Sequence, residues 1–192
     1  MRNILLATGL SLLSSMLPTD VRAAGFMLAA PDFPDGGTIP SAQVFDAGGC
    51  TGGNHSPALS WSAEPPGTQS FAVTMFDPDA PTRHGWWHWT VFNIPAGMHG
   101  LPADAGAAHT TLLPVGAGEG RSDFGFSWYG GPCPPVGDPP HHYEITIYAL
   151  KVAQLPLNAA VPGEMAAAML RANALANALA TARITGLYGR PH

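Results

Sequence analysis

Residues 71–76 (FAVTMF) form a short apolar burst that ends in a turn-forming sequence at residues 77–81 (DPDAP). Residues 89–94 (WTVFNI) and 143–148 (YEITIY) are further bursts of this kind. Short apolar runs separated by Gly, Pro, Asp and Asn are typical of β-strands. The chain also has 23 glycines and 20 prolines scattered between its apolar runs, which favours many turns and few long helices. We therefore predict an all-β fold, either a sandwich or a barrel.

One segment near the C-terminus has helical character. Residues 162–181 are rich in Ala, and their apolar side chains recur at three- and four-residue steps. Pro162 suits the first turn of a helix, Glu164 would lie near its positive end, and Arg183 follows its negative end. We predict a helix over this segment that packs on the sheets, followed by a short strand at residues 184–188 near the functional site.

The charge of the chain is low and slightly acidic. Charged residues make up 11% of the 192 residues, and the net charge is −5. A typical soluble domain has about 25% charged residues. No group of Lys and Arg has the density that would attract nucleic-acid phosphates or an anionic membrane surface. We therefore exclude both as main partners, and the length predicts one domain.

The chain begins with an apolar leader. Residues 4–17 are largely apolar but shorter than the roughly 20 residues that span a bilayer, and small residues follow around Ala23. We interpret residues 1–23 as a signal peptide cleaved after Ala23, with an uncleaved anchor as the alternative. The mature domain, residues 24–192, would then contain no integral membrane segment and would be periplasmic or secreted.

The chain has two cysteines, Cys50 and Cys133. In an exported protein they can persist as a disulfide that closes a long loop. The alternative is that both are buried thiols that pack as small apolar side chains. The spacing alone does not decide, because a disulfide needs Cα atoms within about 7 Å of each other.

The first group of polar residues is the loop at residues 77–81, which carries Asp77 and Asp79. Pro78 and Pro81 restrict the backbone on both sides of Asp79, so the loop should hold its carboxylates firmly. Rigid loops of this kind suit binding sites. For Asp79 we favour the simpler role of capping the turn through backbone amides.

The second group is residues 86–89 (WWHW), which hold three of the five tryptophans. Strand alternation places Trp86 and His88 on one face and Trp87 and Trp89 on the other. A lone His on an apolar strand is more often a core residue than a ligand. The nearby acidic loop favours a functional role for His88.

The third group is residues 130–143 (GGPCPPVGDPPHHY), a Gly- and Pro-rich loop that leads into a strand. A glycine such as Gly131 allows the backbone to approach a bound anion and donate its N–H, and alternation places His141 and Tyr143 together as side-chain donors. These residues would form a small oxyanion receptor. The alternative is a proline-stiffened connection whose histidines face water.

The order and spacing of the three groups resemble the two signature regions of the phosphatidylethanolamine-binding protein family. The resemblance continues at residues 54–61 (NHSPALSW) and 185–190 (TGLYGR), so it covers nearly all of the mature chain, and it is closest to the bacterial Raf-kinase-inhibitor-like branch. It implies an antiparallel Greek-key β-sandwich with a C-terminal helix beside a pocket for phosphate-like and other small anions. The positions that match the pocket of the family are Asp77, Trp86, His88, Gly131, His141 and Tyr143.

Two residues depart from the pattern of the family. His142 stands where the family usually has Arg, and Asn177 stands where many bacterial members have a His on the terminal helix. Replacing Arg by His removes a permanent charge and a planar donor group. Any contact of His142 with a ligand would therefore depend on pH.

We predict that the protein binds a phosphorylated or carboxylated small molecule reversibly, for example a phospholipid head group. In this hypothesis His88 and His141 donate hydrogen bonds to the anion, and Asp77 orients one imidazole. Affinity should weaken as the pH rises, because the imidazoles lose their charge. No cofactor and no metal are expected.

Three alternatives use other chemistry. A hydrolase could use the same Asp, His and Tyr groups as acid and base, although the sequence contains no Gly-x-Ser-x-Gly motif. A metal site could combine His84 and His88, four residues apart, with a carboxylate. The neutral surface could instead bind a protein partner, as an inhibitor or scaffold, or a second copy of the chain.

Overall fold

The computed structural model describes residues 25–191, without the side chains of residues 171–179. The predicted signal peptide therefore lies outside the described residues. No helix of the described part is long and apolar enough to cross a lipid bilayer. In chain order the elements are β1 (Met27–Ala29), the 3-10 helix η1 (Ser41–Gln43), β2 (Leu59–Ser62), β3 (Ser70–Asp77), β4 (Trp86–Pro95), β5 (Gly100–Leu101), β6 (Gly118–Glu119), β7 (His141–Leu150), α1 (Gly163–Asn177) and β8 (Ala178–Tyr188).

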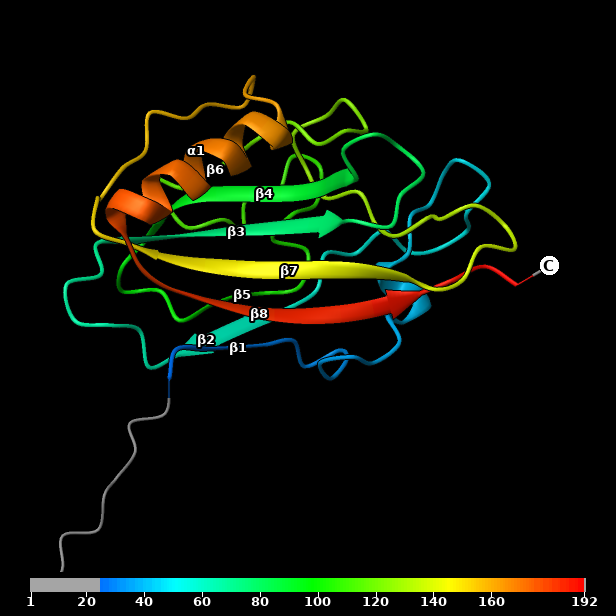
Figure 1. The fold of residues 1–192 in the computed structure, drawn as a ribbon, viewed down its shortest axis with the longest axis horizontal. Helices are drawn as coiled ribbons and strands as arrows, with labels where there is room; N and C mark the ends of the chain where they lie inside the picture. Colours follow the sequence, from blue (N-terminus) through cyan, green and yellow to red (C-terminus); the bar gives the residue numbers. More distant parts are fainter. Residues whose placement is uncertain (1–24, 192) are drawn as a thin grey trace, which may run out of the picture.

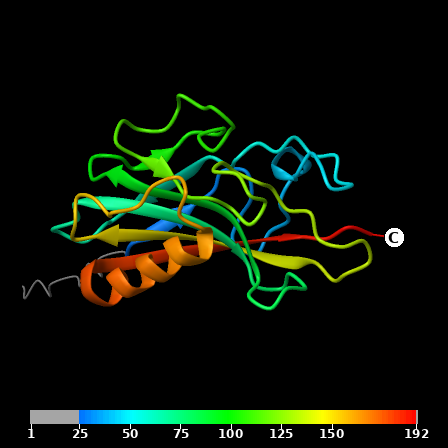
Figure 2. The same ribbon diagram turned by 90° about the horizontal axis from the view of Figure 1, so that it is seen from above.

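The strands form two antiparallel sheets. The smaller sheet has the order β1-β2-β5, and the larger has the order β6-β4-β3-β7-β8. Figure 1 shows the long strands β4, β3, β7 and β8 side by side. The helix α1 lies along one face of these strands in Figure 2, where it contacts β4, β7 and β8. The predicted all-β antiparallel fold with a C-terminal helix is confirmed.

The apolar core is split into two layers by the larger sheet. The inner layer lies between the sheets, where Leu59 and Trp61 of β2 pack with Phe71 and Met75 of β3. The outer layer lies between the sheet and α1 and includes Leu170. Full burial of such a side chain stabilises the fold by about 1.5–3 kcal/mol. These two layers fix the ends of β3, β4 and β7 relative to one another.

The C-terminal helix is shorter than predicted. It ends at Asn177, and residues 178–181, predicted as helical, begin β8. Along its length β8 pairs with β7, from Ala178 beside Leu150 to Tyr188 beside His141, with one register shift between Ala149 and Leu150. This pairing satisfies backbone groups along β7 that would otherwise lie at a sheet edge, and it outweighs the helix propensity of Ala.

A bulge changes the alternation at the start of β4. Trp87 pairs with Phe76, whereas Trp89 pairs with Met75. Cross-strand partners share a face, and the adjacent Met75 and Phe76 point to opposite faces. Trp87 and Trp89 therefore also lie on opposite faces, and His88 is the extra residue of the bulge. The prediction that the two tryptophans share a face is wrong for this reason.

The two cysteines form a disulfide, so the first of the two alternatives is confirmed. The Cys50–Cys133 bond joins segments that are 83 residues apart in sequence. Arg190 holds the same two segments from the C-terminal end, because its guanidinium donates to the carbonyl oxygens of Pro134 and Gly49. Three distant parts of the chain therefore converge at this end of the sheets.

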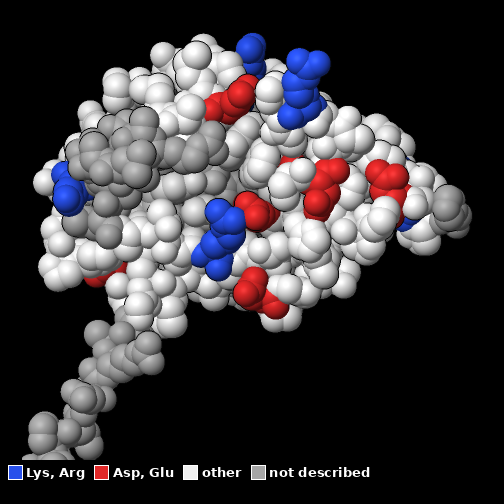
Figure 3. Space-filling model, viewed as in Figure 1, with Lys and Arg blue, Asp and Glu red and all other residues white. Residues whose placement is uncertain are grey.

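The surface carries few charges. Figure 3 shows isolated Lys, Arg, Asp and Glu side chains on a mostly uncharged face. This distribution agrees with the 8 basic and 13 acidic residues of the sequence. A binding site on this molecule must therefore depend on directed hydrogen bonds more than on a strong surface potential.

Candidate functional site

A cavity of about 240 Å³ lies where β3 ends and where β4 and β7 begin. Antiparallel pairing places these three strand termini at the same end of the larger sheet. Asp77, Trp86, His88 and Tyr143 line the cavity, so four of the six predicted site residues are brought together. The wall is completed by Ala80, Pro81, Thr82, Phe124, Pro134 and Pro135, and by the disulfide-bonded Cys133.

The Asp77 carboxylate both shapes the loop and holds an imidazole. Its Oδ1 accepts hydrogen bonds from the backbone N–H groups of Asp79 and Ala80 at 2.8 and 3.0 Å. Its Oδ2 accepts a 2.8 Å hydrogen bond from Nδ1 of His141. Asp77 is 3% exposed, so these contacts fix its orientation. Asp77 therefore caps the turn, the role that we predicted for Asp79.

Asp79 instead bridges to the strand β7. Its Oδ2 accepts hydrogen bonds from the backbone N–H and from Nδ1 of His142, both at 2.7 Å. Partial burial would raise the pKa of Asp79, but the hydrogen bonds and charge of His142 outweigh it and lower this pKa. Both side chains are substantially exposed, and neither lines the cavity. The departure at His142 thus affects a contact outside the cavity.

His141 lies behind the cavity wall. Its Nδ1 faces Asp77 at 2.8 Å and its Nε2 faces the Asp138 carboxylate at 3.5 Å. The residue is 4% exposed and does not line the cavity. The structure therefore places His141 where it positions Asp77, and its two ring nitrogens are directed at carboxylates.

The backbone around Gly130 holds His88. Its Nδ1 lies 2.7 Å from the carbonyl oxygen of Gly130, and its ring makes edge contacts with Phe124 and Tyr143. Burial lowers the pKa of His88 to about 4, and the Gly130 hydrogen bond and the Asp77 charge offset this only in part. The imidazole is therefore neutral at neutral pH.

Three polar atoms of the cavity wall lack a partner. Within residues 25–191, Nε1 of Trp86, Nε2 of His88 and the hydroxyl of Tyr143 are buried and make no hydrogen bond of good geometry. Burial raises the pKa of the Tyr143 hydroxyl, and so do the charge of the Asp77 carboxylate and a contact with it that falls short of hydrogen-bond geometry, so the hydroxyl keeps its proton. A buried polar group without a partner costs about 1–3 kcal/mol. Three such groups around one cavity indicate a place for a polar ligand.

Gly131 has a packing role in place of the anion contact that the sequence predicted. Its N–H donates to Oδ1 of Asn54 at 2.8 Å and is not free for a ligand. A Cβ on Gly131 would lie 2.1 Å from the carbonyl oxygen of Gln43, so only glycine allows these two segments to approach. Asn54 also donates to the carbonyl oxygen of Tyr129, so its side chain attaches residue 54 to the segment that carries Tyr129 and Gly131.

Sequence reasoning missed Phe124 and Asn54. Phe124 lines the cavity and lies 5.4 Å from the rings of both Trp86 and His88. A signal was present, because residues 124–128 (FGFSW) alternate aromatic and small side chains. Asn54 lay inside a segment that resembled the family, but only the folded chain places it beside Gly131.

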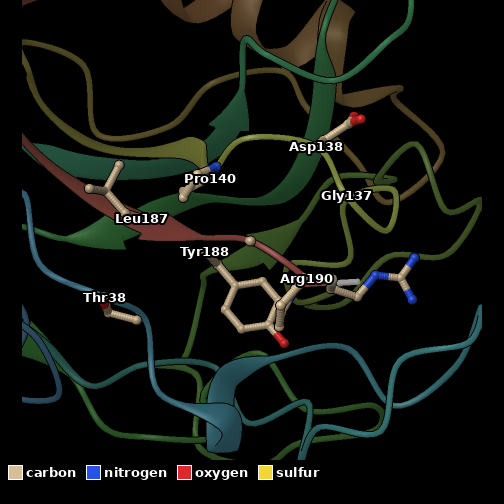
Figure 4. Close-up of a pocket in the computed structure, with 9 residues that line it drawn as sticks. Thr38, Gly137, Asp138, Pro140, Leu187, Tyr188 and Arg190 are labelled. Carbon is tan, nitrogen blue, oxygen red and sulfur yellow. The ribbon is translucent and has the colours of Figure 1, made fainter.

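A larger cleft of about 530 Å³ lies between the segment before β7 and the C-terminal end of β8 (Figure 4). Asp138, Tyr188 and Arg190 contribute its polar groups. The cleft contains none of the unpartnered buried polar atoms found among the described side chains, so the smaller cavity is the stronger candidate site. No three His, Cys, Asp or Glu side chains of the described residues are arranged to hold a metal ion.

Comparison with known proteins gives consistent matches. A family model described as phosphatidylethanolamine-binding protein matches residues 29–189. The UPF0098 protein YbcL of Escherichia coli is 49% identical over 167 residues, which cover 87% of this chain and 89% of YbcL. The UPF0098 protein YbhB of the same organism is 40% identical over 161 residues, which cover 84% of this chain and 98% of YbhB.

Solved structures agree with these matches. The crystal structure of E. coli YbcL, described as a member of the mammalian PEBP family, has a TM-score of 0.82 and covers 86% of this chain and 99% of its own. A phosphatidylethanolamine-binding protein homolog from Chlamydia trachomatis has a TM-score of 0.70 at 28% identity and covers 86% of this chain and 98% of its own. These similarities extend over the strands that bound the cavity.

Proposed function

Because the chain belongs to the phosphatidylethanolamine-binding protein family, we propose that it binds a small phosphate-like or carboxylate anion reversibly in the cavity. The observation that carries this proposal is the set of unpartnered polar atoms of Trp86, His88 and Tyr143 around one cavity. The ligand would be a phospholipid head group or another phosphorylated or carboxylated small molecule. A cavity of about 240 Å³ suits such a group, because it is smaller than the roughly 300–1,000 Å³ of drug-sized pockets.

Binding without turnover is the simpler proposal for this cavity. Cys133 is bonded to Cys50, and Oγ1 of Thr82 donates to the carbonyl oxygen of Gly85. The raised pKa of Tyr143 keeps its hydroxyl protonated. The described wall therefore offers no activated nucleophile for covalent catalysis. Steady release of nitrophenol from p-nitrophenyl phosphate, lost on changing Tyr143→Phe, would instead support a hydrolase.

We also propose that the protein is exported. The apolar leader at residues 4–17 supports export, and so does the disulfide, because disulfides persist in oxidising compartments. N-terminal sequencing of the protein recovered from the periplasm should begin at Ala24. Recovery of the chain with its leader from the cytoplasm would contradict export.

The binding proposal is tested by removing one oxygen atom from the cavity wall. Tyr143→Phe deletes the unpartnered hydroxyl of a fully buried side chain and keeps its ring. A hydrogen bond to a charged group contributes about 1.5–3 kcal/mol, so the dissociation constant for inorganic phosphate should rise about 10- to 100-fold. Isothermal titration calorimetry at pH 5 measures this change.

The matched control is Tyr148→Phe. Tyr148 lies on the same strand, but it belongs to the core layer under α1 on the other face. This variant should bind inorganic phosphate as the wild type does. Equal affinity of all three proteins, or no binding by the wild type of any phosphate or carboxylate probe, would refute the proposed function.

A further inference from the structure

The tautomer of His88 follows from the hydrogen bond at its Nδ1. A backbone carbonyl can only accept, so Nδ1 of His88 carries the proton that bonds to the carbonyl oxygen of Gly130. In the neutral imidazole the other nitrogen then carries a lone pair. Nε2 of His88, buried and without a partner among the described atoms, therefore presents an acceptor to the cavity.

The surroundings of His88 keep the ring neutral. The side chain is 2% exposed, and burial is the main cause of its lowered pKa. The titratable groups that face it are Asp77 from β3 and His141 and Tyr143 from β7. The Asp77 charge favours a protonated ring and the His141 charge opposes it, and burial exceeds both. An anion that enters the cavity thus meets an unprotonated Nε2.

The rest of the wall is not cationic. No Lys or Arg belongs to the described lining of the cavity, whereas the Asp77 carboxylate does. Nε1 of Trp86 and the hydroxyl of Tyr143 can donate hydrogen bonds to an anion. The cavity thus combines two donors with two acceptors, Asp77 and Nε2 of His88. A doubly charged anion would face the Asp77 carboxylate, and no Lys or Arg of the described lining would offset its second charge.

We propose that the cavity selects an oxyanion that carries its own O–H group, of the class of a monoprotonated phosphomonoester. The anionic oxygens would accept hydrogen bonds from Trp86 and Tyr143, and the O–H would donate to Nε2 of His88. A phosphodiester or a sulfate has no O–H and would leave Nε2 facing an oxygen lone pair. This specificity rests on the proposed function and narrows its ligands to phosphomonoesters, so it excludes the diester head group of an intact phospholipid and simple carboxylates. It also reverses the donor role first assigned to His88.

Methyl phosphate and dimethyl phosphate form the decisive pair of probes. At pH 5 both are monoanions, because the second pKa of a phosphomonoester is about 6, but only methyl phosphate retains an O–H. Calorimetric titration of the wild type at pH 5 should give at least tenfold tighter binding of methyl phosphate. Above about pH 6 its affinity should fall roughly tenfold per pH unit as the O–H is lost.

Inorganic phosphate and sulfate extend the test to probes without a methyl group. At pH 5 phosphate carries O–H groups and sulfate carries none, so phosphate should displace methyl phosphate and sulfate at the same ionic strength should not. Displacement by both anions at equal concentrations would overturn the proposed selectivity.

His88→Gln tests the assigned acceptor directly. A glutamine amide can turn its NH₂ toward a ligand, so it can serve an anion that lacks an O–H. The preference for methyl over dimethyl phosphate should drop to within threefold, while the Tyr148→Phe control keeps the wild-type preference. If circular dichroism shows that His88→Gln does not fold, the titrations of the wild type with methyl phosphate and dimethyl phosphate decide alone.

The outcomes separate this inference from the proposed function. Dimethyl phosphate binding within threefold of methyl phosphate at pH 5 overturns the O–H requirement and leaves anion binding intact. Failure of the wild type to bind any of the four probes at pH 5 overturns this inference. Binding of a carboxylate probe in that case would still preserve the broader proposal.

Discussion

Glu119 and His88 are partly or fully buried titratable residues whose pKa values move in opposite ways. Burial raises the pKa of Glu119 to about 7, although the 2.7 Å hydrogen bond from Nε1 of Trp89 lowers it in part. Burial lowers the pKa of His88 to about 4. In both residues burial disfavours the charged form, so each residue makes the stability of the fold depend on pH, each in its own pH range.

The sign of each effect follows from proton binding. Between about pH 4.5 and 7, folded Glu119 holds a proton that the unfolded chain has released, so its contribution to stability is lost as the pH rises. Between about pH 6.5 and 4, folded His88 stays neutral while the unfolded chain takes up a proton, so stability is lost as the pH falls.

We predict that Glu119→Gln removes the first effect. The amide oxygen can still accept the Trp89 hydrogen bond, but no carboxylate forms at high pH. The free energy of unfolding of the variant, relative to the wild type, should therefore increase from pH 4.5 to 8, by at most about 3 kcal/mol. Urea unfolding at several pH values measures this difference, and the His88 contribution cancels because it is common to both proteins.

The control is Glu164→Gln, which changes an exposed acid in the first turn of α1. Its difference from the wild type should stay nearly constant over the same pH range. A pH-independent difference for Glu119→Gln as well would show that burial of this carboxyl does not influence folding.

At the scale of elements, the close approach of two segments depends on Gly131. We predict that Gly131→Ala is destabilising, because its Cβ would lie 2.1 Å from the carbonyl oxygen of Gln43 and 2.7 Å from the backbone nitrogen of Phe45. Backbone atoms cannot move aside cheaply, so the variant should lose about 1–3 kcal/mol, and anion affinity should fall as the cavity wall shifts. Thermal unfolding and phosphate titration measure both effects.

Gly97→Ala is the matched control for this change. A Cβ on Gly97 would meet nothing within 4 Å, and its backbone is not in the left-handed region. The control should be as stable as the wild type or slightly more so. Wild-type stability of Gly131→Ala would exclude the tight packing described here.

The strands could be predicted because their signal is local. The bursts at residues 71–76 and 143–148 lie inside β3 (Ser70–Asp77) and β7 (His141–Leu150), where alternation reflects one buried layer on each face. The end of α1 could not be predicted in this way. Residues 178–181 have the Ala content of a helix, and only their pairing with β7 makes them a strand.

The cavity was predictable in part for a similar reason. Alternation brought Trp86 and His88 to one face, and both line the cavity. The bulge that separates Trp89 from Trp87 depends on the pairing of β4 with β3, which no local pattern records. His141 and Gly131, which were predicted to contact the ligand, do not line the cavity, because their contacts with Asp77 and Asn54 bring distant segments together.

At the scale of the whole molecule, the cavity depends on segments that the sheets alone do not hold. Its wall includes Cys133, Pro134 and Pro135 of the segment before β7, which belongs to neither sheet and has only isolated backbone bonds, from Phe45 N–H to Pro132 and from Gly137 N–H to Arg190. The Cys50–Cys133 disulfide and the hydrogen bonds of Arg190 attach this segment to the rest of the fold. Stability and ligand binding should therefore both respond to loss of the disulfide.

We predict that the double variant Cys50→Ser, Cys133→Ser is less stable by up to about 4 kcal/mol, since a cross-link over about 83 residues removes much loop entropy from the unfolded chain. Its affinity for inorganic phosphate should also fall, because Cys133 lines the cavity. Urea unfolding should show the same loss of stability for the variant and for the wild type with its disulfide reduced. Calorimetric titration should show the same loss of phosphate affinity for these two proteins. A variant that loses stability but keeps full affinity would show that the strand ends carrying Asp77, His88 and Tyr143 hold the anion without help from the cross-linked segment.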